Sequence, residues 1–317
     1  MAVTLAQARL NVTDDLQAGI IDEFAKSSFI LNNIPFHDCV SPVGGGATLT
    51  YGYTRLITQP QAEFRKVNAE YGTHEVEKQR YVTELKVFGG AYEVDRLIAD
   101  MGGLADEVAL QAGQKVKAAS ALFSDTIING NSSADEDVFD GLDVAVTGTD
   151  TEYNAAGTAI DLSTSDAVTA NATAFVDQLD EWLGSMEGVD VILCNAKMCA
   201  KFRAIARRMG MYQVTMDNFG KKVEHYGSIP FVDIGAKAGS NDPIIAIDGD
   251  GNTSIYAVKF GMDAFHAISM AGQPPVKTWL PDFSTAGAVK KGEVEMVAGC
   301  ALKSSKAAGA FRKIKVQ

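Results

Sequence analysis

A long run of apolar residues at helical spacing, between Met101 and Gly130, constrains the fold of this chain most strongly. Its apolar positions recur every three or four residues, so they share one face of a helix. They are Leu104, Val108, Ala112, Val116, Ala119, Phe123 and Ile127. No proline interrupts the run, and Asn129–Gly130 supply a stop signal. The sequence therefore predicts a buried rod of about 25 residues, roughly 37 Å long.

Two extended segments precede this helix. Ala47–Thr58 alternates apolar side chains with threonines, and Glu75–Phe88 alternates charged side chains with apolar ones. A polar connection, Gln59–His74, joins them. These runs predict two strands of about 12 to 14 residues, a ribbon roughly 40 Å long. Because an isolated two-stranded hairpin is marginally stable in water, we expect the ribbon to lie on another surface.

The remaining chain predicts a short arm and an α/β region. Residues 1–38 suggest an arm with a helix capped by Thr13, too short to be a domain. Asp95 can cap a short helix after the ribbon, and Asn195 can cap a basic helix that follows a buried strand at Val189–Cys194. A striped helix lies before that strand, and further strands are expected at 229–234, 244–247, 255–260 and 294–303.

Charge is distributed unevenly along the chain. The net charge of −12 argues against a protein that wraps nucleic acid tightly. Residues 130–190 contain fourteen acidic residues and no Lys, Arg or His, which leaves a net charge of +2 for the rest of the chain. Residues 290–317 have a net charge of +5. Two solvated faces would explain this pattern, and so would two surfaces with different neighbours.

Motifs typical of enzymes are absent from the sequence. There is no nucleophile elbow, P-loop, dinucleotide-binding glycine motif or zinc-protease motif. Asp248–Asn252 resembles the start of a calcium loop, but Thr253 and Lys259 stand where Gly and Glu are needed, so we interpret it as a hairpin turn. The histidines are isolated in sequence, at His37, His74, His225 and His266. We predict no catalytic residue, no metal site and no cofactor.

The four cysteines, Cys39, Cys194, Cys199 and Cys300, lack the spacing of a zinc site. We interpret Cys194 and Cys199 as a buried pair of small hydrophobic side chains. No segment resembles a signal peptide or could span a membrane. Folding in a reducing cytoplasm with free thiols is therefore expected.

The order of these elements resembles that of the major capsid proteins of tailed double-stranded-DNA bacteriophages, whose fold encapsulin nanocompartments share. Phe139–Leu142 looks like the family's Gly-Leu after the long helix, and Tyr226–Val232 like its G-x-P-V turn. The other matching stretches are Leu85–Phe88 leading into Tyr92–Ile98, the helix end Ile127–Gly130, and Tyr256–Gly261. The resemblance spans nearly the whole chain and is carried by the order of these stretches.

The resemblance implies an α+β fold of the phage major-capsid-protein type. Its parts would be an N-terminal arm at 1–42, an extended β-hairpin loop at 43–88, a peripheral domain with a long spine helix at 89–145, an α/β axial domain at 146–264, and a return to the peripheral domain at 265–317. Because Met1 stands directly at the arm, we expect a separate scaffold or none. Some members crosslink a loop lysine to a neighbour's asparagine. Lys66 and Lys78 lie in that region, but nothing in the sequence supports such a bond, and the question of a crosslink stays open.

The implied function is that of a structural shell protein, not an enzyme. Copies would assemble into pentamers and hexamers of an icosahedral shell around double-stranded DNA, with weak or repulsive DNA contacts. Scaffold, portal and decoration proteins are further possible partners, and no membrane is involved. The protein would be found in the virion after assembly in the host bacterial cytoplasm. Candidate intersubunit contacts are Arg65, Lys66, Tyr71, His74 and Arg80.

Two alternatives remain open from the sequence. An encapsulin-type shell would enclose enzyme cargo instead of a genome. A cytoplasmic α/β enzyme with an unrecognised site would form small oligomers.

Overall fold

The computed structural model describes most of the chain. The described residues are 29–41, 45–58, 60–100, 107–210, 213–216, 222–272 and 275–317, with 213–216 and 222 described by their backbone alone. The predicted helix capped by Thr13 lies outside these residues. The α+β fold class is confirmed, because helices and two mixed sheets alternate along the chain.

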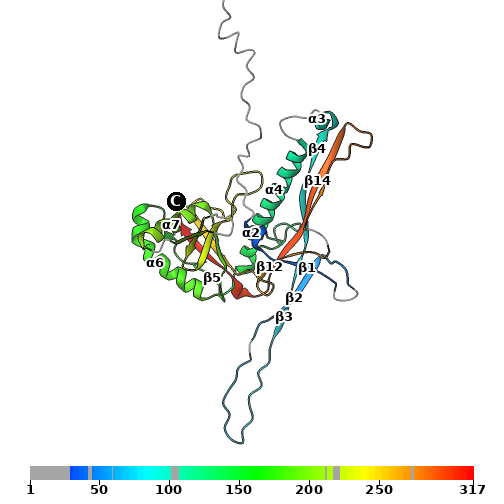
Figure 1. The fold of residues 1–317 in the computed structure, drawn as a ribbon. Coiled ribbons are helices and arrows are strands. Elements are labelled where there is room, and N and C mark those ends of the chain that lie inside the picture. The colour runs from blue at the N-terminus through cyan, green and yellow to red at the C-terminus, as the bar shows by residue number, and fades with distance from the viewer. Residues whose placement is uncertain are drawn as a thin grey trace, which may run out of the picture.

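The first sheet has five strands and carries the long helix. Its strand order is β1-β12-β14-β13, and β4 pairs with β14. The strands are β1 (Phe36–Cys39), β4 (Lys86–Asp95), β12 (Phe265–Met270), β13 (Val276–Trp279) and β14 (Val289–Leu302). Helix α4 (Glu107–Asn129) packs along β4 and β14, which form an upright limb with it (Figure 1). The predicted rod is therefore confirmed from Glu107 onward.

Helix α4 is buried most deeply in its second half. Phe123 is fully buried, and its ring lies within 6.2 Å of those of Phe36, Phe88 and Phe139, measured between centroids. These three partners come from β1, β4 and the segment after the helix. One aromatic side chain of α4 thus packs against three other parts of the chain.

The end of α4 is fixed by a backbone contact at Gly141. Its N–H donates to the Gly130 carbonyl at 2.9 Å, and a Cβ at this position would lie 2.6 Å from the Thr126 carbonyl oxygen. Only glycine allows such an approach. The next residue, Leu142, is buried and begins the short helix α5 (Leu142–Val146). Gly141 and Leu142 therefore hold the segment that follows α4 against the C-terminal end of that helix.

The second sheet has eight strands in the order β5-β15-β11-β7-β10-β9-β8, with β6 also pairing with β15. The strands are β5 (Glu152–Tyr153), β6 (Ile160–Asp161), β7 (Val191–Cys194), β8 (Gln213–Met216), β9 (Lys222–Tyr226), β10 (Ile229–Asp233), β11 (Asn252–Val258) and β15 (Ala308–Lys315). Helices α6 (Ser165–Gly184) and α7 (Ala196–Arg208) pack together against it and make the rounded part of the molecule (Figure 1).

Each face of this sheet belongs to a different core. Ile192, Ile255 and Phe311 point to the side covered by α6 and α7. Leu193 and Tyr256 belong to a second core, which also contains residues of α4 and the five-stranded sheet. This alternation is the period-two pattern of a strand buried on both faces. The two sheets are therefore joined by a shared apolar core.

The helix caps follow the sequence closely. Asn195 Oδ1 accepts from the Met198 N–H at 2.9 Å, and Asp95 Oδ1 accepts from the Leu97 N–H at 2.8 Å at the start of α3 (Arg96–Asp100). Both predicted caps are confirmed. Thr164 caps α6 in the same way, with an accepted bond of 3.1 Å from the Ala167 N–H.

Two sequence expectations need correction. Strand β15 pairs with β11 in the eight-stranded sheet, so residues 265–317 do not all return to the five-stranded one. Its partner is decided by distant residues, which local pattern does not report. Residues 244–247 form no strand, although Ile244 and Ile245 are buried. Across the described residues, no helix combines the length and apolar character needed to cross a membrane.

Candidate assembly surfaces

The hairpin is shorter in strand than its sequence predicted. Strands β2 (Thr50–Leu56) and β3 (Lys78–Glu84) pair antiparallel and extend away from both sheets (Figure 1). At the buried residue Leu85 the chain leaves β3, which pairs with β2, and enters β4, which pairs with β14 instead. The predicted strand Glu75–Phe88 is thus two strands with different partners. Residues 60–77 contain no strand, because their polar sequence has no alternation to support one.

One face of the hairpin is aromatic. Tyr51, Tyr53 and Arg55 of β2 are half-buried, while the residues between them are exposed. The rings of Tyr53 and Tyr81 stack with centroids 5.7 Å apart, and the Arg55 guanidinium lies 4.3 Å from the centre of the Tyr81 ring. These contacts stiffen the base of an element that has no core of its own.

The same face is bonded to the body of the chain. The Tyr53 hydroxyl donates to the Leu302 carbonyl at 2.8 Å, and Arg55 Nε donates to the Lys303 carbonyl at 2.8 Å. Arg55 Nη2 also donates to the Leu302 carbonyl. Burial raises the pKa of Tyr53, and the neighbouring Arg55 partly opposes this. The base of the hairpin is therefore held at the end of β14.

Two histidines lie beneath this base. The ring centroids of His37 and His266 are 5.9 Å apart, and both rings lie within 5.6 Å of the Tyr51 ring. His266 is fully buried, and among the described residues neither of its ring nitrogens has a hydrogen-bond partner of good geometry. The sequence places these histidines 229 residues apart, so its local pattern could not predict the pair.

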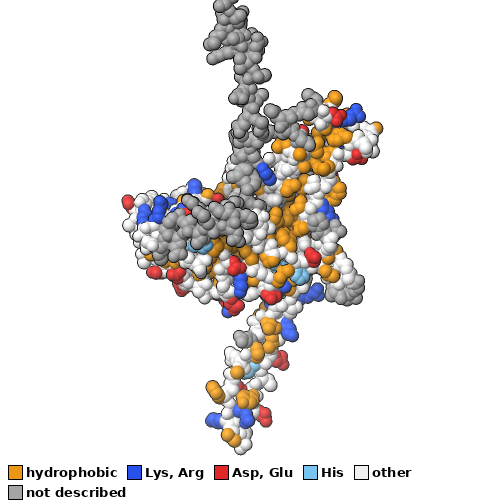
Figure 2. Space-filling model, viewed as in Figure 1, with side chains coloured by type: hydrophobic (Ala, Val, Ile, Leu, Met, Phe, Trp, Pro, Cys, Tyr) orange, Lys and Arg blue, Asp and Glu red, His pale blue; other side chains and the backbone are white. Residues whose placement is uncertain are grey.

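The tip of the hairpin exposes large apolar side chains. Phe64 is fully exposed, and Val67 and Tyr71 are 89% and 60% exposed. Hydrophobic side chains continue down the hairpin to its tip (Figure 2). Large apolar groups gathered on a projecting loop are typical of a contact surface. Phe64 and Val67 are not among the predicted contact residues, although they are large apolar residues inside a polar loop.

The predicted contact residues occupy two places. Arg65, Lys66, Tyr71 and His74 lie in the exposed tip, where the Arg65 guanidinium is 5.3 Å from the centre of the Tyr71 ring. Arg65 Nη1 also donates to the Ala69 carbonyl at 3.3 Å. Arg80 lies apart from them on β3, opposite Thr54 and also exposed. The structure brings Arg65 and Tyr71 into contact at the tip and leaves Arg80 on the stem.

The five-stranded sheet has an outer face that α4 does not cover. Trp279, Glu293 and Ala91 form a row across β13, β14 and β4, and all three are exposed. Val87 extends this face and is 57% exposed. Gly89 lies between Val87 and Ala91 on this face and adds no side chain to it. The outer face of the five-stranded sheet is therefore a second candidate contact surface.

A charged group joins the link after α4 to the eight-stranded sheet. Arg312 Nη1 lies 2.6 Å from Asp143 Oδ1, and its Nε bonds Glu152. The Tyr256 hydroxyl donates to Asp143 at 2.7 Å, and burial and the Asp143 charge raise the Tyr256 pKa. Asp143, Tyr256 and Arg312 border a hollow of about 310 Å³. The charge of Arg312 is already neutralised by Asp143 and Glu152, so we interpret this group as a structural contact between the link after α4 and the eight-stranded sheet.

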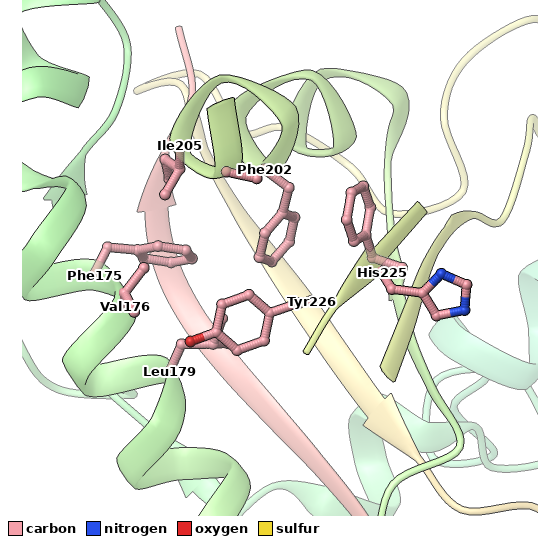
Figure 3. Close-up of a pocket in the computed structure, with 9 residues that line it drawn as sticks. Phe175, Val176, Leu179, Phe202, Ile205, His225 and Tyr226 are labelled. Carbon is pink, nitrogen blue, oxygen red and sulfur yellow. The ribbon is translucent and has the colours of Figure 1, made fainter. Parts of the chain in front are cut away.

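A second cavity lies between α6, α7 and β9, where Phe175, Leu179, Phe202 and Tyr226 converge (Figure 3). Its volume is about 10 Å³, room for no more than one water molecule. No three His, Cys, Asp or Glu side chains within the described ranges lie close enough to hold a metal ion. Asp248 accepts bonds from the Asp250 and Asn252 N–H groups, as in a polar turn.

Comparison with known proteins identifies the fold. No protein-family model and no curated protein matches the sequence. The holo-SrpI encapsulin complex from Synechococcus elongatus PCC 7942 superposes with a TM-score of 0.66 and 12% identity, covering 99% of this chain and 97% of that one. A structure from Mycobacterium phage Bobi gives a TM-score of 0.62 and 12% identity, covering 98% of this chain and 99% of that one. The capsid of a native GTA particle gives 0.60 and 14%, covering 99% of both chains.

Proposed function

We propose that this chain, whose fold is that of phage capsid proteins and encapsulins, is the major capsid protein of a tailed double-stranded-DNA bacteriophage. The observation that carries the proposal is the full-length likeness to shell subunits. In this proposal the chain is a structural component of the virion and not an enzyme.

The hairpin would be the arm that joins neighbouring copies. Its tip exposes Phe64, Val67 and Tyr71, and the outer face of the five-stranded sheet exposes Val87 and Trp279. Two different apolar surfaces on one chain suit a heterologous contact, which repeats into closed rings. The tip of one copy would lie on the outer sheet face of the next. Arg65, Lys66, His74 and Arg80 would add polar contacts around it.

The two sheets would serve different parts of the shell. The five-stranded sheet with α4 would be the peripheral domain, and the eight-stranded sheet, including β15, would be the axial domain. Pentamers and hexamers built from them would be stabilised by many modest contacts. The acidic residues of segment 130–190 would repel packaged DNA if they face the interior. Scaffold, portal and decoration proteins would act during assembly in the bacterial cytoplasm.

An encapsulin-type shell is the second candidate. It is favoured by the likeness to an encapsulin over almost the full length of both chains, with a TM-score of 0.66. Both candidates require the same hairpin and the same ring contacts. They differ in what the shell encloses.

Electron microscopy of the purified full-length protein tests the proposal. A shell protein gives rings or closed particles, whereas small oligomers alone would refute the shell function. Particles are then produced together with the neighbouring genes of the native source and purified. Their nucleic-acid-to-protein absorbance ratio and the nuclease sensitivity of their contents separate the two candidates. DNA protected inside the particles supports the capsid, and protein cargo without DNA supports the encapsulin.

A further inference from the structure

The paired cysteines of the eight-stranded sheet lie at a helix start whose geometry forces them together. Asn195 is the cap residue of α7, so Cys194 is the residue before the cap and Cys199 is the fourth residue of the helix. Apolar side chains at these two positions regularly pack against each other and fix the entry of the chain into the helix. In this chain both positions carry thiols.

The two sulfur atoms are 2.8 Å apart. Non-bonded heavy atoms rest at about 3.5 Å or more, and a disulfide bond is about 2.05 Å long. Bond formation therefore needs an approach of only about 0.8 Å. Cys194 Sγ also lies 3.5 Å from the Val232 carbonyl oxygen, which limits where that thiol can rotate.

The backbone around the pair is held firmly. The Asn195 side chain donates to Thr253 Oγ1 at 2.7 Å and to the Ile245 carbonyl at 3.1 Å, and it accepts from the Met198 N–H. Cys194 ends β7, a central strand, and both cysteines are buried in the core under α6 and α7. The sulfur atoms consequently have few ways to move apart.

We propose that Cys194 and Cys199 form a dithiol–disulfide pair, which closes between β7 and α7 when the protein meets an oxidising disulfide such as oxidised glutathione. One protein thiolate attacks glutathione disulfide and releases one glutathione. The second protein thiolate attacks the resulting mixed disulfide at the protein sulfur and releases another. The protein loses two hydrogen atoms, and one glutathione disulfide becomes two thiols.

Burial sets the rate of this reaction. It raises the pKa of the Cys194 thiol, and the adjacent Cys199 raises it further, so little thiolate exists at neutral pH. Closure would therefore be slow and would depend on transient opening of the helix start. On the proposed function, the bond would form after the shell leaves the reducing cytoplasm. The chemistry of the pair itself does not depend on that function.

The sequence offers a sharp readout. Trypsin cuts after Lys117, Lys197 and Lys201, so Cys194 and Cys199 fall in the adjacent peptides 118–197 and 198–201. A disulfide keeps these two peptides joined, and reduction releases the four-residue peptide. Cys39 and Cys300 are also buried, and they act as internal controls that should stay reduced.

The experiment exposes the full-length protein to oxidised glutathione at about pH 8.5, the ordinary pKa of a cysteine. The urea concentration is increased, but kept below the unfolding transition, until N-ethylmaleimide labels Cys194 and Cys199 in a parallel sample. This labelling proves that reagents reach both thiols. After denaturation and alkylation we expect a mass loss of two hydrogens, two alkylated cysteines instead of four, and the joined peptides. Four alkylated cysteines, or a bond involving Cys39 or Cys300, would overturn the inference.

Thermal unfolding provides a second measurement. The oxidised protein should melt about 2 to 5 °C higher than the reduced protein, because the short loop is closed in the unfolded state. Cys199→Ser should abolish the difference, and the matched variant Cys300→Ser should keep it. A difference that persists in Cys199→Ser would contradict the assignment. Particle images test the shell function separately, so failure of either proposal is recognised independently.

Discussion

His37 and His266 face each other beneath the hairpin, with ring centroids 5.9 Å apart and ring planes inclined by 62°. They come from neighbouring strands, β1 and β12, which pair in parallel. The charge of Lys303 lowers the pKa of His266 and the charge of Asp263 raises it. Lys303 Nζ also lies 5.7 Å from the centre of the Tyr51 ring. A proton added to His266 therefore places a second positive charge in a closed aromatic site.

This arrangement predicts that acid weakens the fold. Burial, followed by Lys303 and His37, lowers the His266 pKa from 6.5 to about 4. Between pH 6.5 and pH 4 the unfolded chain therefore binds more protons at this histidine than the folded chain does. The free energy of unfolding is unaffected by His266 above pH 6.5 and decreases as the pH falls toward 4. With allowance for solvent screening, the loss is roughly 2 kcal/mol. Urea unfolding at several pH values measures it.

His266→Gln is the matched variant for this measurement. It should remove the part of the pH slope that lies between pH 6.5 and 4, while the slope from carboxylates remains. An unchanged slope in the variant would mean that His266 is not the titrating group.

The hairpin clamp predicts a modest but specific loss. Tyr53→Phe removes the hydroxyl that donates to the Leu302 carbonyl and keeps the stacked ring. We expect a loss of about 1 kcal/mol in unfolding free energy and faster tryptic cleavage after Arg55. Tyr71→Phe, on the exposed tip, is the control and should leave both quantities unchanged in the free subunit. Equal behaviour of the two variants would show that the clamp contributes nothing.

Helix α4 predicts a severe effect on folding. Ala119 is 4% exposed, so Ala119→Asp buries an unpaired carboxylate and should cost several kcal/mol. Chemical denaturation, or the soluble fraction if the variant aggregates, measures it. Leu122→Asp lies on the same helix with 37% of its surface exposed and should be tolerated better. A soluble, normally assembling Ala119→Asp protein would mean that the buried face is misassigned.

The loop tip predicts a defect in assembly without a defect in folding. The Ile57 N–H donates to the Glu77 carbonyl and the Glu77 N–H to Thr58 Oγ1, both at 2.8 Å, so the loop ends already lie together. Replacing residues 59–76 with an Asn-Gly turn should leave the melting temperature nearly unchanged and abolish particles.

Trypsin gives an independent reading of the same loop. Cleavage after Arg65 and Lys66 should be fast in free subunits and much slower in particles, where a neighbour restrains the loop. Normal particles from the loop deletion, or equal cleavage in both states, would contradict an intersubunit arm.

The acidic segment predicts an effect on nucleic-acid content. Glu136 and Asp137 have exposed side chains, whereas Asp135 Oδ1 accepts from the Asp137 N–H and helps to form the turn. Glu136→Lys with Asp137→Lys should therefore leave the turn intact. If the segment faces the interior, particles should retain more nucleic acid, and the retention should fall with salt. Glu136→Gln with Asp137→Asn is the charge-removal control, and unchanged content would place the segment elsewhere.

Elements with local signals could be predicted from the sequence. The apolar period of α4, the caps Asn195 and Asp95, and the small residue Gly141 each act within a few residues. Cys194 and Cys199 were also predicted as a buried pair, because a strand end and a helix start meet there. The hairpin was expected from its alternation, although its strands were predicted too long.

Features that depend on distant partners could not be predicted. Whether β15 joins β11 or the other sheet is decided by packing of residues that are far apart in sequence. His37 meets His266, and Arg312 meets Asp143, through the same kind of long-range pairing. Exposure is also invisible in the sequence, which is why Phe64 was overlooked. Its role as a contact remains a prediction.

The place of β15 has a consequence for the order of events on the ribosome. This strand lies between β11 and β5, inside the eight-stranded sheet, yet it follows every other described strand in chain order. The sheet therefore stays open along β11 until residue 315 has left the exit tunnel. Strands β5 and β6 join this sheet through β15, so a nascent chain that ends before residue 308 cannot yet hold them in the sheet.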